Sequence, residues 1–169
     1  MPASAYPNMG PSLRRHAGFT LIELVITVAI VAILSTVALP LAEVTIQRAK
    51  EHELRAALRQ IREAIDAYKQ AVDEGRITRR TNESGYPKSL EVLAAGVEDA
   101  KAPKKAQIYF LRRIPHDPMA TDSTLPPSET WGKRSYASPP DEPKAGDDVF
   151  DVYSLSTGVG LNGIRYREW

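Results

Sequence analysis

The apolar residues of this chain are concentrated in one long run near the N-terminus. Residues 19–42 carry a single charged side chain, Glu23. As an α-helix with a rise of ~1.5 Å per residue, the run would be roughly 36 Å long. That length exceeds the hydrocarbon core of a bilayer, which is about 30 Å thick. The pattern therefore predicts a membrane-embedded helix over residues 19–42.

Beyond residue 42 the pattern becomes amphipathic. Apolar side chains recur at alternating spacings of four and three residues, while charged side chains occupy the other faces. Gly75 is typical of a helix C-terminus. We therefore expect the helix to continue over residues 43–75 and to pack one face on a small domain. The residues of this apolar face are Leu54, Leu58, Ile61, Ile65, Tyr68 and Val72.

Pro40 lies near the end of the apolar run. A proline lacks the backbone N–H and crowds the carbonyl four residues earlier, here that of Thr36. We therefore expect a kink near residues 36–40, where Ser35 and Thr36 can bond to backbone groups. We also expect this stretch to unwind when the chain packs into a larger assembly.

Residues 1–18 contain Arg14 and Arg15, no acidic residue and three prolines. A basic stretch before an apolar run resembles the start of a secretory signal, but a signal has its small-residue cleavage site after the run. Here the small residue, Gly18, comes before it. The arginine pair predicts that this end of the helix stays in the cytoplasm.

Glu23 is an unfavourable residue in a membrane helix. A charged side chain at the bilayer centre costs about 2.5–3.5 kcal/mol on insertion scales, and less near the end of a helix. A cut between Gly18 and Phe19 would create a positive amine that Glu23 could pair with, in its own chain or in a neighbour. The alternative is a signal anchor whose Glu23 reaches the lipid head groups.

Residues 76–169 predict a small mixed domain. Tyr86-Pro87 precedes a short helix that begins near Lys88 or Ser89 and ends near Gly96. An extended segment is expected over residues 109–115, and β-prone pieces over 133–138 and 149–156. Together these predict an α+β fold, with a small antiparallel sheet of two or three strands packed on the long helix.

The N-terminal residues resemble a known motif. Gly18-Phe19-Thr20-Leu21-Ile22-Glu23-Leu24, after an arginine pair, is similar to the prepilin cleavage motif of type IV pilins and type II secretion pseudopilins. The resemblance implies that a prepilin peptidase cuts between Gly18 and Phe19 and methylates the new N-terminus. It also implies that Glu23 neutralises a neighbour's amine during assembly, and that Pro40 is the family's helix-kinking proline.

The C-terminal half narrows the resemblance to the major pseudopilins of type II secretion systems. An insertion, residues 119–130, separates two motifs that the family usually joins, which indicates a divergent subgroup. The motifs are Tyr86-Pro87-x-Ser89-Leu90-x-x-Leu93, Ile114-Pro115-x-Asp117-Pro118, Trp131-Gly132, Asp151-Val152-Tyr153-Ser154, Asn162-Gly163 and Trp169.

The resemblance also implies a calcium site made of two aspartate side chains and backbone carbonyls. Such hard oxygen ligands suit calcium. Asp151 matches the first aspartate, and Asn162 stands where the second is expected, without its charge. Asp147 and Asp148 could supply carboxylates from the preceding loop. The alternative is that these residues form turns, and that side-chain hydrogen bonds replace the ion.

The resulting hypothesis is a structural subunit rather than an enzyme. It divides the chain into a cleaved leader (1–18), a transmembrane and filament-core helix (19–42), its amphipathic continuation (43–75) and a periplasmic domain (76–169). The expected partners are other copies in a helical filament, prepilin peptidase, minor pseudopilins, an inner-membrane assembly platform with its ATPase, and the lipid bilayer before assembly.

Two other functions stay open. One is a type IV pilin subunit for adhesion or motility, although the chain has no cysteine pair for the disulfide loop common in those pilins. The other is a membrane-anchored periplasmic enzyme, for which no nucleophile, P-loop or metalloprotease motif is found. The net charge of +1 gives no indication of a nucleic-acid partner.

Overall fold

The structure is a computed structural model that describes residues 18–103 and 106–169, except for the side chains of residues 37–40. The predicted leader, apart from Gly18, lies outside the described residues. Contacts divide the chain into two units that meet between Ala42 and Glu43. Each unit is described by itself below.

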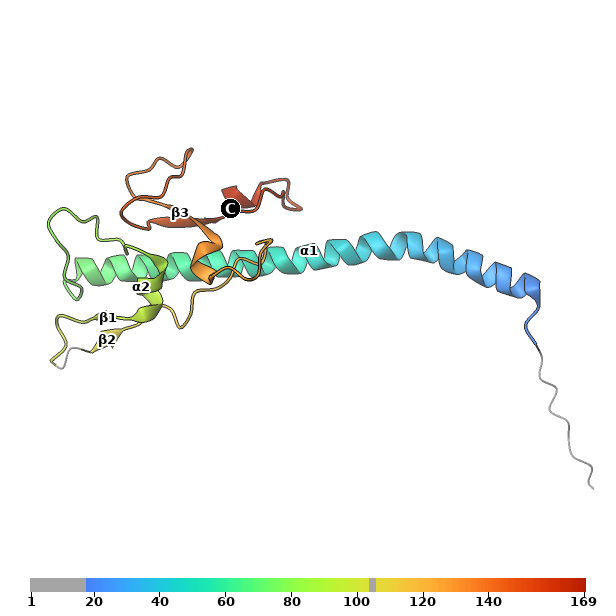
Figure 1. Ribbon diagram of the computed structural model, residues 1–169, viewed down its shortest axis with the longest axis horizontal. Coiled ribbons are helices and arrows are strands. Elements are labelled where there is room, and N and C mark those ends of the chain that lie inside the picture. Colours follow the sequence, from blue (N-terminus) through green and yellow to red (C-terminus); the bar gives the residue numbers. More distant parts are fainter. Residues whose placement is uncertain (1–17, 104–105) are drawn as a thin grey trace, which may run out of the picture. The chain divides into compact units, whose positions relative to one another are not determined.

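One helix, α1, spans Leu21–Asp73 (Figure 1). The described chain contains one helix that is long and apolar enough to cross a membrane, and it is this one. In the first unit the helix begins after three residues without regular secondary structure. Glu23 is the single charged side chain of residues 21–42. The predicted membrane-embedded helix is therefore present as a helix of suitable length and composition.

The backbone stays helical through residues 36–40, so Pro40 does not end the helix. Two hydroxyl groups just before it bond to backbone carbonyls one turn back. Ser35 Oγ donates to the Val31 carbonyl at 2.8 Å, and Thr36 Oγ1 donates to the Ile33 carbonyl at 2.7 Å. These hydroxyls act on the backbone as expected. The side chain of Pro40 lies outside the described residues, and the unwinding on assembly stays a prediction.

In the second unit, the predicted apolar face of α1 forms the core. Leu54, Ile61 and Ile65 are completely buried, and Leu58 is nearly so. Burying each such side chain contributes about 1.5–3 kcal/mol, which makes this face the main source of stability. The helix ends as predicted, because Gly75 adopts a positive φ of 70° and donates its N–H to the Val72 carbonyl at 2.9 Å.

The helix α2, Leu90–Ala95, confirms the short helix predicted between Ser89 and Gly96. Gly96 has a φ of 89°, and a Cβ there would come within 2.7 Å of the Tyr109 ring. Glycine is therefore required for both reasons. The chain then forms a small antiparallel hairpin of β1, Val97–Glu98, and β2, Gln107–Ile108.

A second antiparallel pair joins β3, Trp131–Arg134, to β4, Asp151–Ser154. Trp131 pairs with Ser154, and Arg134 pairs with Asp151. The prediction was wrong in detail, because β3 begins earlier than residue 133 and ends before Ser135. Residues 135–138 form a turn closed by a hydrogen bond from the Ser138 N–H to the Ser135 carbonyl at 3.0 Å.

The two pairs are separate sheets rather than one. In the view of Figure 1 they lie on opposite sides of α1. The extended segment predicted over residues 109–115 is not a strand. Instead, the N–H groups of Phe110 and Leu111 bond to the Leu93 carbonyl at 3.1 and 2.9 Å.

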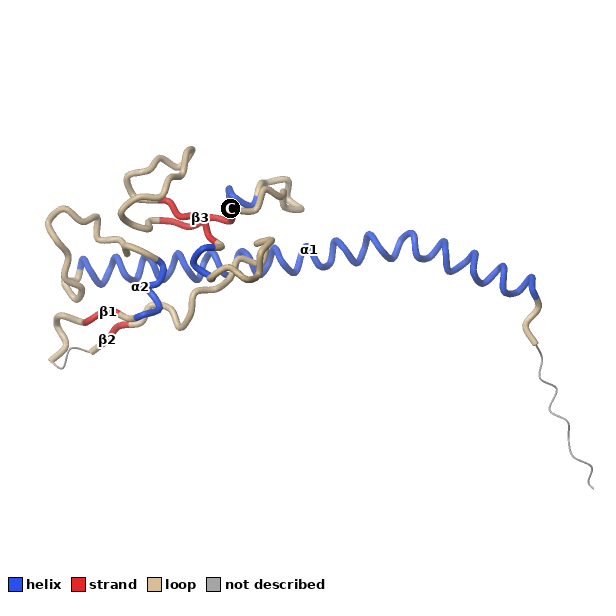
Figure 2. The backbone as a smooth tube through the Cα atoms, in the orientation of Figure 1, coloured by secondary structure: helices blue, strands red, loops and turns tan. Residues whose placement is uncertain are grey.

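Much of the second unit is loop (Figure 2). Two 3₁₀ turns interrupt the loops, η1 at Pro127–Glu129 and η2 at Tyr166–Glu168. The α+β fold class is confirmed: a long helix carries a small domain of short antiparallel strands. With so few strand residues, other contacts have to hold the loops against α1.

Candidate functional site

The predicted cleavage point lies in an exposed segment without regular secondary structure. Residues Gly18, Phe19 and Thr20 precede α1 and are all solvent-exposed. A Cβ built on Gly18 would meet no atom within 4 Å, so the backbone there is open. A peptidase needs an accessible bond outside a helix, and the bond between Gly18 and Phe19 is exposed and precedes α1.

Thr20 caps the N-terminus of α1, a role that the sequence reasoning missed. The Glu23 N–H donates to Thr20 Oγ1 at 3.3 Å, and the Leu24 N–H donates to the Thr20 carbonyl at 3.1 Å. A threonine followed three residues later by a glutamate is the sequence pattern of a capping box, and could have indicated this helix start. The motif therefore fixes where the helix begins.

Glu23 lies in the first turn of α1 and is exposed. The positive end of the helix dipole favours a carboxylate at this position. Glu23 forms no ion pair with any of the residues that the structure describes. Its carboxylate therefore stands at the start of an apolar helix, where a positive group from another chain could reach it.

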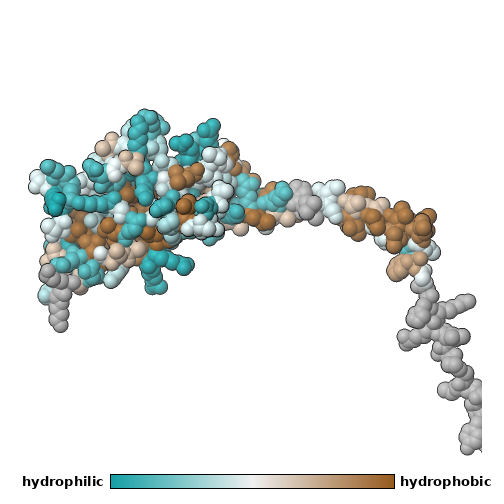
Figure 3. All heavy atoms as spheres, viewed as in Figure 1, coloured by the Kyte–Doolittle hydropathy of each residue, from teal (hydrophilic) through white to brown (hydrophobic). Residues whose placement is uncertain are grey.

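The side chains that follow form an exposed apolar surface. Every large apolar side chain from Phe19 to Leu34 is at least 52% exposed. Figure 3 shows this hydrophobic stretch, and shows hydrophilic residues over much of the second unit. Exposed apolar surface of this extent requires lipid or other protein to cover it.

A second group of candidate residues gathers on α1 in the other unit. Glu51 is only 4% exposed, although it carries a carboxylate. Its Oε1 accepts hydrogen bonds from the Leu161 N–H at 2.7 Å, the Tyr166 hydroxyl at 3.1 Å and Gln47 Nε2 at 3.3 Å. Burial, and then the bond to Glu51, raise the pKa of Tyr166. These contacts tie the loop before η2 to the helix.

Sequence reasoning missed Glu51, yet a signal was present. The residue comes three positions before Leu54 and so lies on the buried apolar face of α1. A buried carboxylate is unfavourable unless hydrogen bonds satisfy it. A glutamate on such a face therefore indicates that backbone donors from elsewhere in the chain come to meet it.

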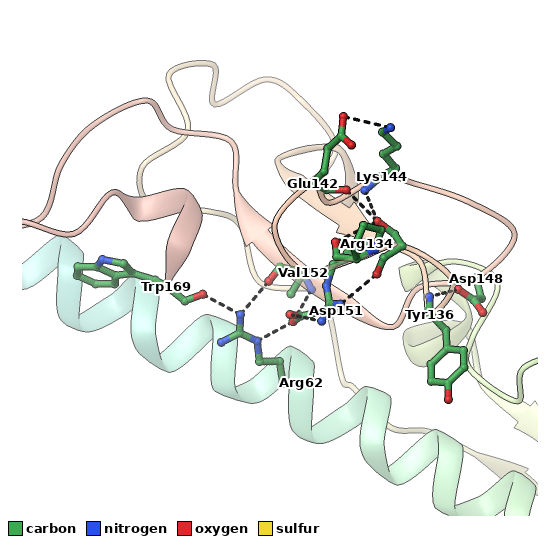
Figure 4. Close-up of polar contacts among 11 residues, drawn as sticks. Arg62, Arg134, Tyr136, Glu142, Lys144, Asp148, Asp151, Val152 and Trp169 are labelled. Carbon is green, nitrogen blue, oxygen red and sulfur yellow. Dashed lines mark hydrogen bonds and ion pairs between the residues drawn. The ribbon is translucent and has the colours of Figure 1, made fainter.

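About three turns further along α1, Arg62 contacts the predicted calcium ligand Asp151. Arg62 Nε donates to Asp151 Oδ1 at 2.8 Å, and Nη2 donates to the carbonyls of Val152 at 3.1 Å and Trp169 at 2.8 Å (Figure 4). Arg134 Nη2 lies 3.4 Å from Asp151 Oδ2. Both carboxylate oxygens therefore face a guanidinium group.

The other predicted calcium ligands lie elsewhere. Asp148 accepts hydrogen bonds from Ser84 Oγ, from Ser135 Oγ at 2.7 Å and from the Tyr136 N–H at 2.9 Å. Asp147 is exposed.

Asn162 is also exposed, and its Oδ1 accepts a bond from the Ile164 N–H at 3.0 Å within its own turn. Among the described residues, no group of three His, Cys, Asp or Glu side chains is placed to hold a metal ion. Asp148 and Asp151 are instead each bonded to other groups of the chain, and calcium binding stays a prediction.

Asp117 closes the base of the predicted insertion. Its side chain is almost fully buried, and accepts bonds from the Met119 N–H at 2.8 Å and Ser154 Oγ at 2.6 Å. Its own N–H donates to Thr130 Oγ1 at 3.1 Å. Both ends of residues 119–130 therefore meet at one residue, Asp117: Met119 bonds to its carboxylate and Thr130 to its backbone N–H, while Ser154 of β4 bonds to the same carboxylate.

A family model and several known proteins are similar in sequence to this chain. The family model of the prokaryotic N-terminal methylation motif matches residues 13–39. No solved structure gives a significant match.

Three relatives are type II secretion system core proteins G. The protein from Dickeya chrysanthemi is 24% identical over 155 residues, which cover 89% of this chain and 94% of the relative. The protein from Klebsiella pneumoniae is 26% identical over 143 residues, which cover 81% and 94%. The protein from Pectobacterium carotovorum subsp. carotovorum is 27% identical over 148 residues, which cover 84% and 88%. The resemblance inferred from the sequence motifs is thereby confirmed.

The contacts of Glu51 lead to a stability prediction. Glu51→Ala removes the acceptor of the Leu161 N–H and of the buried Tyr166 hydroxyl. We expect the free energy of unfolding to fall by about 1–3 kcal/mol. The measurement is denaturant unfolding of the full chain in detergent, followed by tryptophan fluorescence. The exposed Glu53 is the control, and Glu53→Ala should change stability by less than about 0.5 kcal/mol. Equal effects of the two variants would contradict the anchoring role of Glu51.

The contacts of Asp148 lead to a pH prediction. Burial raises the pKa of Asp148, but its hydrogen bonds to Ser84, Tyr136 and Ser135 outweigh burial and leave the pKa below its ordinary value. A carboxyl group whose pKa is lowered by folding stabilises the protein above the unfolded-state pKa. That stabilisation is lost as the pH falls through the folded-state pKa.

Asp148→Asn should therefore be less stable than the wild type at neutral pH, and the difference should shrink as the pH falls below the ordinary aspartate range. Melting temperatures measured from neutral to acidic pH test this. Asp147→Asn, a change at the exposed neighbour, is the control and should show no such convergence. A difference for Asp148→Asn that stays constant with pH would refute the argument.

Proposed function

Because the chain is homologous to type II secretion system core protein G, at modest identity over most of its length, we propose that it is a structural subunit of a periplasmic pseudopilus. The observation that carries the proposal is the join within α1. A helix that begins at a methylation motif with exposed apolar side chains continues as the helix that forms the core of a polar domain. Such a chain can lie in a membrane and can also pack its helix against copies of itself.

Processing by a prepilin peptidase fits the N-terminal geometry. We place the cut between Gly18 and Phe19, with methylation of the Phe19 amine. Support comes from the open, exposed backbone at Gly18 and from the capped helix that begins two residues after Phe19. Removal of the leader would leave two residues before α1. Such a short N-terminus suits close packing of helices.

Glu23 is the proposed assembly residue. In a core made of apolar helices, an unpaired carboxylate would be unfavourable by about 2.5–3.5 kcal/mol at the most buried depth. Pairing with the amine of a neighbouring Phe19 removes this penalty. Since Glu23 forms no ion pair with the described residues of its own chain, its carboxylate is available to a neighbour. The pairing would fix the axial position of each incoming subunit.

Pro40 is the proposed site of adaptation during assembly. Proline leaves the helix one hydrogen bond short, which lowers the free energy needed to unwind that turn. Ser35 and Thr36 already bond to carbonyls one turn back and could rearrange with the backbone. Local unwinding would allow α1 to pack in the filament without moving the second unit.

The membrane and the assembly machinery complete the proposal. Before assembly, the helix spans the inner membrane once with the C-terminal domain in the periplasm, as the basic leader favours. The chain carries no nucleotide-binding motif, so the energy for extraction has to come from an ATPase on the assembly platform. Minor pseudopilins are the expected partners at the filament tip.

Gene deletion distinguishes this function from that of a surface pilus. Loss of the subunit should abolish secretion of folded exoproteins and leave surface pili intact, because the filament acts in the periplasm. Secretion assays and electron microscopy of the same strain measure the two outcomes. Lost pili with normal secretion would instead support a type IV pilin.

Glu23→Ala tests the assembly step. The variant should be processed normally, because the bond after Gly18 is unchanged, but filaments should be lost. Electrophoretic mobility measures processing, and the sheared filament fraction measures assembly. Glu43→Ala, at an exposed glutamate on the same helix, is the control and should assemble. Normal filaments from Glu23→Ala would refute the pairing.

A further inference from the structure

The guanidinium group of Arg62 lies among oxygen atoms from the last part of the chain. Its Nε contacts the Asp151 carboxylate, and its Nη2 contacts the carbonyls of Val152 and Trp169, at distances between 2.8 and 3.1 Å (Figure 4). These oxygen atoms belong to both ends of the segment from β4 to η2. One side chain of α1 therefore holds the segment at its beginning and at its end.

The oxygen atoms around Arg62 are the kind that calcium prefers. Calcium binds carboxylate and backbone carbonyl oxygens, and one carboxylate with backbone carbonyls resembles the ligand set that we expected for it. Arginine can replace such an ion, since it keeps its positive charge at every physiological pH and offers several N–H donors in a fixed plane. A hydrogen-bonded guanidinium satisfies these oxygens without a metal.

A second positive charge makes a metal less favourable still. Arg134 Nη2 lies 3.4 Å from the other oxygen of Asp151, and the Arg134 side chain is 16% exposed. A divalent cation at Asp151 would have to approach two guanidinium groups that cannot lose their protons. Coulomb repulsion between like charges at this range opposes its binding.

Neighbouring contacts hold the same segment in place. The Arg55 guanidinium lies 4.2 Å from the centre of the Trp169 ring, and that ring packs edge-on against Tyr166. Glu51 binds the Leu161 N–H. Glu51, Arg55 and Arg62 are four and seven residues apart, so they lie on one side of α1.

We propose that Arg62 is the built-in cation of the segment 151–169, and that this domain reaches its folded form without calcium. The guanidinium group occupies the centre of the oxygen cluster that a metal would otherwise organise. Stability then depends on a residue of α1 itself, and is independent of the divalent ions in the surroundings.

The first test uses the full wild-type chain in detergent. Its melting temperature is measured by near-ultraviolet circular dichroism with excess calcium chloride and with a calcium chelator. We expect the same melting temperature in both conditions. A higher melting temperature with calcium would overturn the proposal.

The second test compares Arg62→Met with Arg59→Met. Arg59 is an exposed arginine on the same helix, with no hydrogen bond or ion pair to the described residues, so it is a matched control. Arg62→Met should lower the melting temperature by at least about 4 °C and accelerate amide hydrogen exchange in residues 151–169. Arg59→Met should do neither. Equal behaviour of the two variants would overturn the proposal, and if Arg62→Met does not fold, the wild-type comparison still decides.

Discussion

The buried face of α1 between Glu51 and Val72 is the constraint on which the second unit depends. Its apolar side chains provide the core, and its polar side chains fix the loops. Strands of two to four residues cannot by themselves order a domain that is mostly loop. The chain has no cysteine, so no disulfide assists them. Order comes instead from buried or half-buried charged groups that accept or donate several hydrogen bonds each.

These charged groups share one physical logic. Glu51 and Asp117 are each buried, and each is satisfied by donors from distant parts of the chain. Removing any partner would leave a buried polar group unpaired, which is more unfavourable than the bond is favourable. Such groups therefore select one arrangement of the loops over others. The loops are irregular, but their positions relative to α1 are specified.

The first unit of the chain differs from the second, because its apolar side chains are exposed rather than buried. There the helix satisfies most of its backbone groups internally, so it tolerates a solvent that offers no hydrogen bonds. The two parts of α1 therefore follow different rules, the first set by its surroundings and the second by its own domain.

Sequence patterns predicted the features that depend on local periodicity. Spacing and residue type indicate the apolar run and the buried face of α1. They also indicate the end of α1 at Gly75 and the short helix between Ser89 and Gly96. The sheet was harder, because residue type favours strands but does not fix partners. The strands form two separate pairs, and the Ser135–Ser138 turn ends β3 earlier than residue type indicates.

The candidate site shows the limit most clearly. The motif Gly18–Glu23 can be identified from its letters alone, although its capping role was overlooked. Asp151 was expected to bind a metal, and its true neighbours are Arg62 and Arg134, 89 and 17 residues away. No periodicity links such positions. Likewise, Trp131 Nε1 donates to the Pro115 carbonyl at 2.8 Å. This bond joins two motifs that are separate in the sequence.

The closure of residues 119–130 at Asp117 has a consequence for how such a chain can change over time. Both ends of the stretch are held at one residue, Asp117, through its carboxylate and its backbone N–H, so the pairing of β3 with β4 does not depend on the residues between those ends. The entropy of closing a loop grows only slowly with its length, by about 0.6 kcal/mol for each doubling. Residues can be gained or lost there at little thermodynamic expense. Related proteins can therefore differ in the length of residues 119–130 while they keep the same fold elsewhere.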